Sequence, residues 1–537
     1  MYKSTVDLNR RDMLAAVALG MVVLVLGGYL MVVGVCGLYH DDAIYVITAK
    51  ALAHDQGYRL INIPHSPAQT KYPIIYPALL AVIWCLWPSF PENLLAMQSL
   101  SLLASAITIG LCYLYLVRFG YCKRSIAASA GLLCATSSEF LYFSTVTLSE
   151  MPFALLLIVT LWELDRYVMA SYSSRTSQLL LGVFLCLPFL CRTIGLPFIA
   201  AGLIIVYLAK RPVKWVALGS AIVFFPWIMW AVNGWDSLGR GSDLGYYTDY
   251  ISWWKSGALT SIGDIVFYNL LGALWNSCNL AFQLFSKMKS GMDSFFQMVI
   301  VLFVGAIPWV IIMSKLRQFN ILAWFLISYL TIILLWPWPP GRFLVPILPI
   351  LLPYLLIGII MIRQRLFSRS LYQIVATAGL SVIVIFNLVQ AHTIHQKNQL
   401  TGLPFVDSDI SWSSYERTFD WLRANTPVEA VVASGLDTMI YLYTGRQGFR
   451  PFKHKPLSLF YGQDSPPLGT VEELIQFLDT YHTKYLVHFP MPRFAEEKPF
   501  AELIEKVRIQ YPDKLKPIYT DIDKRFMIFE VMFLKKI

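Results

Sequence analysis

Charged residues are scarce in this sequence. They make up 14% of its 537 residues, whereas hydrophobic residues make up 57% and aromatic residues 15%. Soluble proteins of ordinary composition carry about 25% charged residues, so this balance excludes a soluble globular chain. The composition therefore indicates a membrane protein in which most segments are apolar helices.

Cysteine is missing from the last part of the chain. All eight cysteines lie at or before Cys278, in or beside apolar segments. The segment 392–537 therefore cannot be held together by disulfides, and it must be stabilised by a hydrophobic core of its own. Its length is normal for one folded domain.

Several chemical signatures are also absent. The segment 392–537 contains no Gly-rich phosphate loop and no nucleophile elbow, and the chain shows no internal repeat. No His-x-x-x-His or Cys-rich spacing is present either, so we expect no metal ligands among the candidate residues. A divalent metal requirement stays open, because the sequence neither indicates nor excludes one.

The apolar segments predict the topology. The first apolar run, Leu14–Leu38, is longer than the apolar core of a signal peptide and long enough to cross a bilayer core of roughly 30 Å. Basic residues near helix ends stay on the cytoplasmic side, which places the N-terminus inside and the C-terminus outside after about eleven crossings. The predicted spans are 14–38, 94–117, 125–146, 151–169, 178–191, 194–209, 215–232, 295–313, 320–336, 343–361 and 371–391.

Two other apolar stretches are not predicted to cross the membrane. The stretch 74–87 is only about 14 residues long and lies between Pro73 and Pro88, so it is expected to be interfacial or re-entrant. The stretch 264–285 carries its asparagines on one side of a helix, a pattern typical of a helix lying on the bilayer surface.

The predicted organisation has two domains. Residues 1–391 form a transmembrane module with an external loop 39–73 and a long external loop 233–293, and residues 392–537 form an extracytoplasmic α/β domain. In the second domain the periodicity predicts a helix around residues 415–422, strands at 431–434 and 440–443, a turn at Gly445, a helix at 471–481, a strand at 485–489, a helix at 501–511 and a closing strand at 526–533.

The most informative residues are the adjacent carboxylates Asp41 and Asp42. They follow the first apolar run and precede Lys71-Tyr72-Pro73, which opens the next apolar segment. A helix cap needs only one carboxylate, so a pair at the outer end of a span indicates more than capping. We therefore expect an active site that faces away from the cytoplasm.

The motif Asp41-Asp42-Ala43-Ile44-Tyr45, followed by Lys71-Tyr72-Pro73, resembles the GT-C superfamily of polytopic glycosyltransferases. The closest resemblance is to aminoarabinose transferases, protein O-mannosyltransferases and rhizobial lipopolysaccharide galacturonosyltransferases. The segments Thr147–Pro152 and Gly341–Pro349 are similar to further motifs of these families. The sequence departs from the aminoarabinose pattern at Thr70, where that family has Glu, and from the common Tyr at Phe343.

This resemblance implies transfer of a sugar from a polyprenyl-phosphate donor to an extracytoplasmic lipid, glycan or protein, with inversion. Asp41 is the expected base, and Asp42 is expected to position the acceptor or to hold Asp41. The remaining roles implied are donor phosphate binding by Lys71, Arg342 and Arg192, and sugar or acceptor binding by Glu150, Tyr45 and Tyr72.

Structural explanations compete with these roles. Lys71, Arg192 and Arg342 could snorkel to the interface or cap helices, and Glu150 could simply favour a helix N-terminus. At the level of the whole protein, the alternatives are a transporter or flippase of a lipid-linked sugar and a non-catalytic assembly subunit. Transporters usually show pseudo-repeats, which this sequence lacks.

The formal charge of +10 does not indicate nucleic-acid binding, because basic residues in cytoplasmic loops serve orientation and contact with anionic lipids. The expected partners are the donor, the acceptor and membrane lipids, and the expected location is a bacterial inner (plasma) membrane. The sequence does not identify the sugar, the acceptor, the carrier chain or the oligomeric state.

Overall fold

A computed structural model describes residues 5–170, 172–234, 244, 247, 261–282, 292–364, 369–406, 409–453 and 455–532. The chain forms two compact units. The first, here called the helical unit, comprises Met1–Met31, Gln98–Trp227 and Gly263–His395. The second, here called the mixed unit, comprises Val32–Met97, Ile228–Ile262 and Gln396–Ile537.

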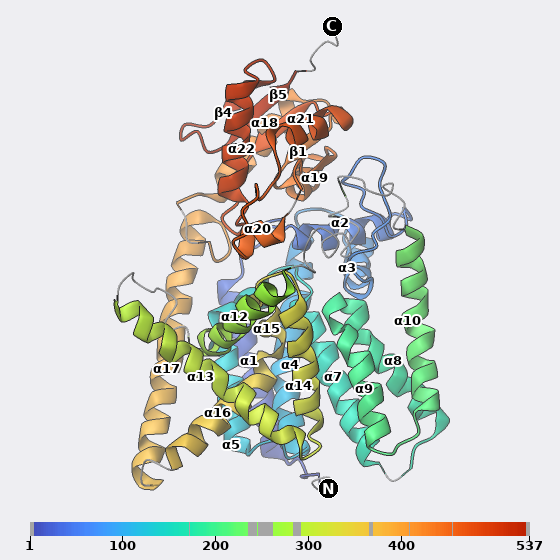
Figure 1. Cartoon of the computed structure of the whole chain (residues 1–537), viewed down its shortest axis with the longest axis vertical. Coiled ribbons are helices and arrows are strands. Elements are labelled where there is room, and N and C mark those ends of the chain that lie inside the picture. Colours follow the sequence, from blue (N-terminus) through green and yellow to red (C-terminus); the bar gives the residue numbers. More distant parts are fainter. Residues whose placement is uncertain are drawn as a thin grey trace. The chain divides into compact units, whose positions relative to one another are not determined.

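The helical unit contains most of the long helices of the chain (Figure 1). Its elements, some of which extend past the unit boundaries, are α1 (Arg10–Leu30), α4 (Leu94–Arg118), α5 (Arg124–Thr136), α6 (Ser138–Thr145), α7 (Glu150–Met169), α8 (Arg175–Cys191), η1 (Thr193–Gly195), α9 (Leu196–Leu208), α10 (Lys214–Gly234), α12 (Ile262–Phe282), α13 (Met292–Leu316), α14 (Ile321–Leu335), α15 (Gly341–Leu344), η5 (Val345–Ile347), α16 (Leu348–Gln364) and α17 (Arg369–Thr401).

Six helices of the described part of the chain are long and apolar enough to cross a membrane. The pair α5–α6, bent by 63°, would add a seventh span. Each predicted span overlaps a helix, but several of these helices are shorter or more polar than a free-standing span requires. The mostly helical membrane architecture is therefore confirmed, and the number of about eleven crossings stays a prediction.

The first helix is shorter than predicted. The apolar run extends to Leu38, but α1 ends at Leu30. Gly34 and Gly37 follow with φ angles of 87° and 105°, a left-handed conformation that glycine adopts without steric cost. The acidic pair is therefore not at the end of the first span and instead begins a separate helix.

The stretch 264–285 was predicted to expose its asparagines on the bilayer surface, but Asn269 on that face is buried in the protein. Asn269 of α12 is 1% exposed, whereas Phe267 on the same helix is 57% exposed. The amide of Asn269 donates to the carbonyl oxygens of Ile333 and Trp336 at 3.1 and 2.6 Å. The amide of Asn269 thus adds a second donor to carbonyl groups at the end of α14, and these bonds compensate its burial.

The mixed unit begins with two short helices, α2 (Asp41–Ala53) and α3 (Ile75–Leu86). The indole N–H of Trp84 in α3 donates to the carbonyl oxygen of Val46 in α2 at 3.1 Å. With 12 residues, α3 is shorter than a membrane span, and its interfacial or re-entrant placement stays a prediction.

The C-terminal part of the mixed unit is a five-stranded sheet with helices, drawn in orange and red in Figure 1. The strand order is β2-β1-β3-β5-β4; β1 pairs in parallel with β2 and β3, and β5 pairs antiparallel with β3 and β4. The elements are α18 (Trp412–Asn425), β1 (Val432–Ser434), α19 (Asp437–Thr444), β2 (Gly448–Phe449), α20 (Pro456–Phe460), α21 (Val471–Thr480), β3 (Tyr485–His488), α22 (Glu497–Gln510), β4 (Leu515–Thr520) and β5 (Met527–Val531).

The predicted strand at 440–443 is wrong, because these residues belong to α19. Short buried apolar runs are compatible with either a strand or a helix, and periodicity does not separate the two. Gly445, with φ at 79°, ends this helix in the left-handed conformation. The edge strand β4 was not predicted, because it contains Pro517 and mostly half-buried or exposed residues.

The compact units do not follow the predicted division into 1–391 and 392–537. The last stretch of the mixed unit begins at Gln396, close to the predicted boundary, but this unit also includes Val32–Met97 and thus the predicted loop 39–73. Hydrogen bonds join these segments; for example, the amide of Gly448 donates to the carbonyl of Asn62 at 2.8 Å. Most of the predicted loop 233–293 lies outside the described residues.

Candidate active site

Asp41 and Asp42 are the first two residues of α2, where the helix dipole favours negative charge. Asp42 is 4% exposed, and its carboxylate accepts the backbone N–H groups of Gly37 at 2.7 Å and Tyr39 at 3.2 Å. These bonds fold the segment 37–40 back onto the start of the helix. Asp42 therefore holds the loop that leads into α2.

Burial raises the pKa of Asp42 to about 6, and the adjacent Asp41 acts in the same direction. The backbone N–H groups of Gly37, Ala43 and Tyr39 oppose this rise because they stabilise the charged carboxylate. Asp42 therefore exchanges its proton nearer to neutrality than an ordinary aspartate.

Asp41 is the more accessible member of the pair. Its side chain is half-buried, and its Oδ1 accepts a hydrogen bond of 2.5 Å from the hydroxyl of Tyr72. The structure thus brings together the two motifs that the sequence separates by thirty residues. Asp41 combines a fixed orientation with exposed surface, which is what a base acting on a bound molecule requires.

Lys71 and Tyr72 are both buried, at 3% and 8% exposure. The side-chain oxygen of Gln69 accepts their backbone N–H groups at 2.8 and 3.2 Å, and this fixes the direction of the segment. The ammonium group of Lys71 lies 5.4 Å from the centre of the Tyr72 ring. Tyr72 therefore contacts both the predicted phosphate-binding Lys71, through its ring, and Asp41, through its hydroxyl.

Tyr45 lies on α2 and is 2% exposed. Its ring packs edge-on against Tyr72 at 5.3 Å and against Tyr76 at 5.1 Å. These contacts make Tyr45 part of the aromatic packing that supports Tyr72.

A second charged group lies in the helical unit. Glu150, the first residue of α7, is fully buried and pairs with Arg192 Nη1 at 2.6 Å and with Arg342 Nε. Arg192, at the junction of α8 and η1, also donates to the hydroxyl of Ser149 at 3.1 Å. Three predicted site residues that are far apart in the sequence therefore form one ionic cluster.

In the contacts described, two guanidinium groups share the carboxylate of Glu150. Guanidinium groups bind phosphate through charge-assisted hydrogen bonds. The sequence did not reveal that Glu150 bonds both arginines, because nothing in the local pattern of any of the three segments indicates it.

The predicted residues thus fall into two groups, each within one unit. Asp41, Asp42, Tyr45, Lys71 and Tyr72 belong to the mixed unit. Glu150, Arg192 and Arg342 belong to the helical unit.

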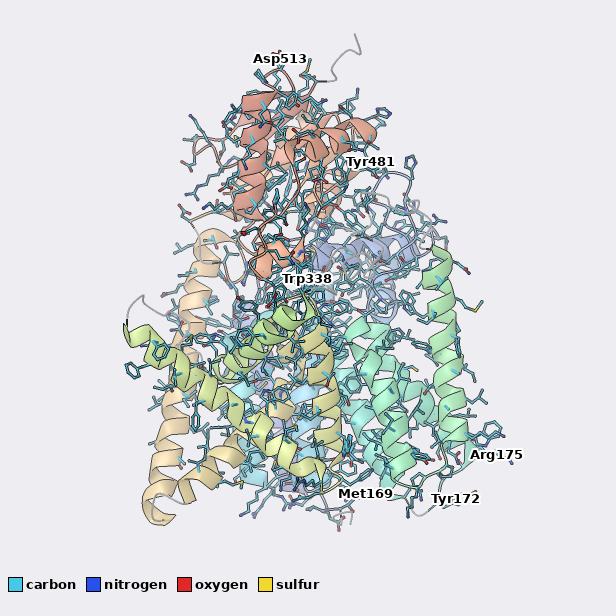
Figure 2. All side chains as sticks on the ribbon, in the orientation of Figure 1. Met169, Tyr172, Arg175, Trp338, Tyr481 and Asp513 are labelled. Carbon is cyan, nitrogen blue, oxygen red and sulfur yellow. The ribbon has the colours of Figure 1, made fainter. Side chains whose placement is uncertain are left out.

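Figure 2 shows Trp338, on the connection between α14 and α15, near one end of the helical unit, and Met169, Tyr172 and Arg175 near the other. Because α7 runs from Glu150 to Met169, its ionic cluster lies at the end of the helix away from the α7–α8 turn.

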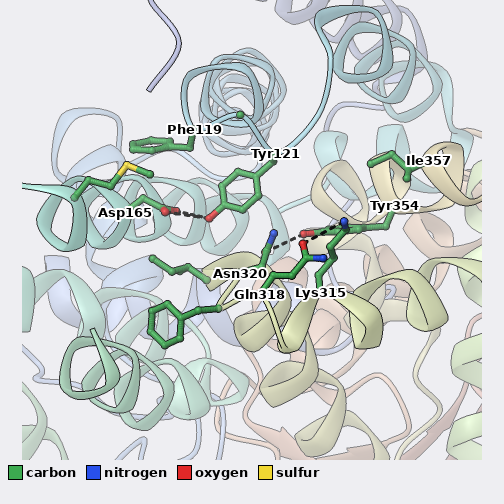
Figure 3. A pocket seen from close by; sticks show the side chains of 12 residues that line it. Phe119, Tyr121, Asp165, Lys315, Gln318, Asn320, Tyr354 and Ile357 are labelled. Atoms are coloured by element: carbon green, nitrogen blue, oxygen red, sulfur yellow. Dashed lines mark hydrogen bonds between the residues drawn. The ribbon is translucent and has the colours of Figure 1, made fainter. Parts of the chain in front are cut away.

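A cavity of about 200 Å³ is present in the helical unit at the end of α7 opposite to Glu150. Its wall includes Asp165, Tyr121, Lys315 and Asn320 (Figure 3). The carboxylate of Asp165 accepts hydrogen bonds from Tyr115 at 2.5 Å and from Tyr121 at 2.8 Å, which tie α7 to α4. None of the predicted site residues lines this cavity, so it does not belong to the predicted site.

The contacts described at Asp42 and His40 are hydrogen bonds within the protein. Both oxygens of Asp42 accept backbone N–H groups, and Nε2 of the neighbouring His40 faces Asp437. In the part of the chain that the structure describes, no three His, Cys, Asp or Glu side chains lie close enough together to hold a metal.

No known family profile matches the sequence, and no curated protein is similar to it in sequence. Solved structures do match its fold. The archaeal oligosaccharyltransferase AglB from Archaeoglobus fulgidus, in complex with an inhibitory peptide and a dolichol-phosphate, aligns with a TM-score of 0.57 at 11% identity, over 97% of this chain and 74% of that chain.

ArnT from Cupriavidus metallidurans, bound to undecaprenyl phosphate, aligns with a TM-score of 0.50 at 12% identity, over 96% of this chain and 97% of that chain. Both proteins are GT-C glycosyltransferases. The chain has the GT-C fold. A second structure of the Archaeoglobus fulgidus enzyme, in complex with Zn and sulfate, aligns at 13% identity with a TM-score of 0.56, over 96% of this chain and 72% of that chain. At these identities the likeness establishes the GT-C fold, and a shared fold does not by itself establish a shared activity.

Proposed function

We propose that this protein is an integral membrane glycosyltransferase. It moves a sugar from a polyprenyl-phosphate donor to an extracytoplasmic acceptor, with inversion at the anomeric carbon. The observation that carries the proposal is the half-buried carboxylate of Asp41, held by Tyr72 beside the buried Asp42 in a chain with the GT-C fold. The dolichol-phosphate and undecaprenyl phosphate bound by AglB and ArnT support the donor class.

The proposed reaction is a single displacement. The acceptor hydroxyl or amine attacks the anomeric carbon, and the bond between this carbon and the phosphate oxygen breaks. The electron pair of that bond leaves with polyprenyl phosphate, and the acceptor proton passes to Asp41. Tyr72 keeps the Asp41 carboxylate oriented, and Asp42 keeps the first turn of α2 in place.

The departing phosphate needs cations, because negative charge develops on it as the bond breaks. We assign this role to Lys71, Arg192 and Arg342. Glu150 has no exposed surface, so it acts on the sugar or acceptor only through the two arginines that it holds. Tyr45 and Tyr72 belong to the proposed sugar or acceptor surface; Tyr72 acts there directly, and Tyr45 supports its ring.

The proposed setting is a bacterial inner membrane with about eleven crossings. The N-terminus is cytoplasmic, residues 1–391 form the membrane module, and residues 392–537 form an extracytoplasmic domain. Apolar helices throughout the helical unit and the likeness to ArnT, a bacterial membrane protein bound to undecaprenyl phosphate, support this setting.

The test uses purified protein in lipid nanodiscs with a panel of polyprenyl-phosphate sugars and, as the source of acceptors, an extract of membrane lipids, glycans and proteins. We expect the wild type to consume one donor and Asp41→Asn to lose about 10²-fold or more in kcat, the contribution typical of a general base. Asp55→Asn is the matched control, because Asp55 is exposed and lies just after the same helix. It should transfer at the wild-type rate.

Two results would contradict the proposal. Normal transfer by Asp41→Asn would remove Asp41 as the base. Donor binding by the wild type without consumption of any donor would favour a flippase of lipid-linked sugars or a non-catalytic assembly subunit.

A further inference from the structure

The residue that precedes the acidic pair has an unusual backbone conformation. His40 is the N-terminal cap of α2 and has a φ of 63°, a conformation that non-glycine residues adopt only when surrounding contacts impose it. Its carbonyl accepts the first helical N–H, from Ile44, at 3.0 Å. The orientation of His40 therefore sets the direction in which α2 starts, and with it the direction of Asp41 and Asp42.

A carboxylate of the C-terminal domain holds His40. The ring Nε2 of His40 lies 3.1 Å from Oδ1 of Asp437, and both side chains are buried, at 1% and 0% exposure. Asn62 donates its side-chain N–H to the other oxygen of Asp437 at 3.2 Å. Burial raises the pKa of Asp437 to about 7, and Arg450, with Nε 3.8 Å from Oδ1, opposes this rise because it favours the charged carboxylate.

Two further residues of α19 contact the same loop. The hydroxyl of Tyr443 donates to the carbonyl of Gly34 at 2.6 Å and accepts the backbone N–H of Cys36 at 3.0 Å. Gly37 packs so closely on Met439 that an added Cβ would meet the Met439 Cβ at 2.9 Å. One helix of the C-terminal domain thus fixes the loop 34–40 at three points.

We propose that Asp437 is a positioning residue of the active site, acting through His40 on Asp41 and Asp42. In this assignment the contacts of α19 with the loop 34–40 orient the proposed base. The C-terminal domain then contributes to the chemistry without touching the reacting atoms. The inference rests on the proposed function, because it takes Asp41 as the base. Its structural part, the hold of α19 on the loop 34–40, can be measured without any activity.

The kinetic test compares Asp437→Ala, Asp437→Asn and Asp464→Ala. Loss of the carboxylate frees His40, and a misplacement of about 1 Å at a reacting group costs about 10²-fold in rate, so we expect kcat of Asp437→Ala to fall by about 10- to 100-fold. KM for the donor should stay unchanged, because Asp437 does not contact the donor. Asp437→Asn keeps an oxygen that can accept from His40 and should restore most of kcat.

Asp464→Ala is the control, because Asp464 is exposed in the same domain. Its kcat and KM should equal those of the wild type.

Hydrogen exchange of peptides covering 34–44 provides a readout that does not depend on activity. We expect faster exchange there in Asp437→Ala, and also in Tyr443→Phe, which removes the hydroxyl bonded to Gly34. Asp464→Ala should leave exchange unchanged. If Asp437→Ala does not fold, the exchange rates of peptides 34–44 are compared between the wild type, Asp437→Asn and Tyr443→Phe.

The outcomes separate the two proposals. If the wild type transfers no sugar, the proposed function fails, and faster exchange at 34–44 in the variants would still establish the hold of α19 on the loop. If wild type and Asp437→Ala have equal kcat, or exchange at 34–44 is unchanged, the positioning role is overturned. A loss of kcat in Asp437→Asn as large as in Asp437→Ala would also contradict it, because the hydrogen-bond acceptor would then not matter.

Discussion

At the scale of single residues, the acidic pair shows how environment separates two identical side chains. Asp42 is buried and accepts backbone N–H groups of Gly37 and Tyr39, whereas Asp41 is half-buried and bonded by the hydroxyl of Tyr72. The first arrangement fixes the chain, and in the second the residue stays partly exposed. The two residues therefore have different roles although they are neighbours on the same helical turn.

The raised pKa of Asp42 predicts a pH dependence of stability. Its pKa is about 6 in the folded state, whereas an aspartate in an unfolded chain has the ordinary value of 3.8, so between these values the folded state binds more protons. The free energy of unfolding therefore decreases as the pH rises from about 4 to about 6, and it stays lower above that range. A difference of two pKa units corresponds to roughly 2 to 3 kcal/mol.

Asp42→Asn should remove this component. The measurement is the unfolding midpoint in detergent at pH 4.5 and pH 7 for the wild type, Asp42→Asn and the exposed control Asp55→Asn. We expect a smaller difference between the two pH values in Asp42→Asn than in the other two proteins. Equal differences in all three would show that Asp42 has an ordinary pKa.

At the scale of elements, the ends of helices carry the charged groups. Glu150 begins α7, Arg192 ends α8 and Arg342 lies in α15, and their ion pairs join these three ends. Removing one partner of a buried ion pair is costly because the other charge stays buried without compensation. The cluster therefore both stabilises the helical unit and provides the positive charge that we assign to phosphate binding.

Binding of undecaprenyl phosphate tests that assignment. Arg342→Gln should weaken binding about 10- to 100-fold, the loss expected when a hydrogen bond to a charged group is removed. Arg166→Gln is the control, because Arg166 is exposed and pairs only locally with Glu163 in α7 among the described contacts. Dissociation constants from native mass spectrometry of the two variants would decide it; equal constants would remove Arg342 from the phosphate site.

At the scale of the whole molecule, the mixed unit is assembled from distant parts of the chain. It joins Val32–Met97 to Gln396–Ile537, so the proposed base and the sheet domain belong to one compact body. A loop that contacts a folded domain is more strongly ordered than a loop that crosses open solvent. The acidic pair therefore depends on a domain whose sequence follows it by several hundred residues.

The predicted topology leads to a labelling experiment. In a background of Cys85→Ser and Cys122→Ser, which removes the two cysteines that are not buried, a cysteine at Asp464 should react with an impermeant maleimide in intact cells. A cysteine at Arg211 should react only after permeabilisation, because basic loops stay in the cytoplasm. Labelling of the Arg211 position in intact cells would overturn the assigned orientation.

Much of the helical architecture could be predicted, because each apolar segment is recognised from its own residues. Errors arose where a local pattern has two solutions. The run 440–443 is apolar enough for a strand but forms α19, and Leu14–Leu38 is continuous in hydropathy although α1 ends at Leu30. Hydropathy alone shows neither which conformation a short apolar run takes nor where a helix within a long run ends.

The sequence by itself determined the membrane class, the approximate positions of the long apolar helices and the choice of Asp41, Asp42 and Lys71-Tyr72 as candidate chemistry. These depend on composition, hydropathy and residue type, which are properties of short segments. Only the tertiary structure decided that Tyr72 bonds Asp41, that Glu150 pairs with Arg192 and Arg342, and that Asp437 holds His40. These contacts join residues far apart in the chain, and such contacts form only when packing brings their elements together.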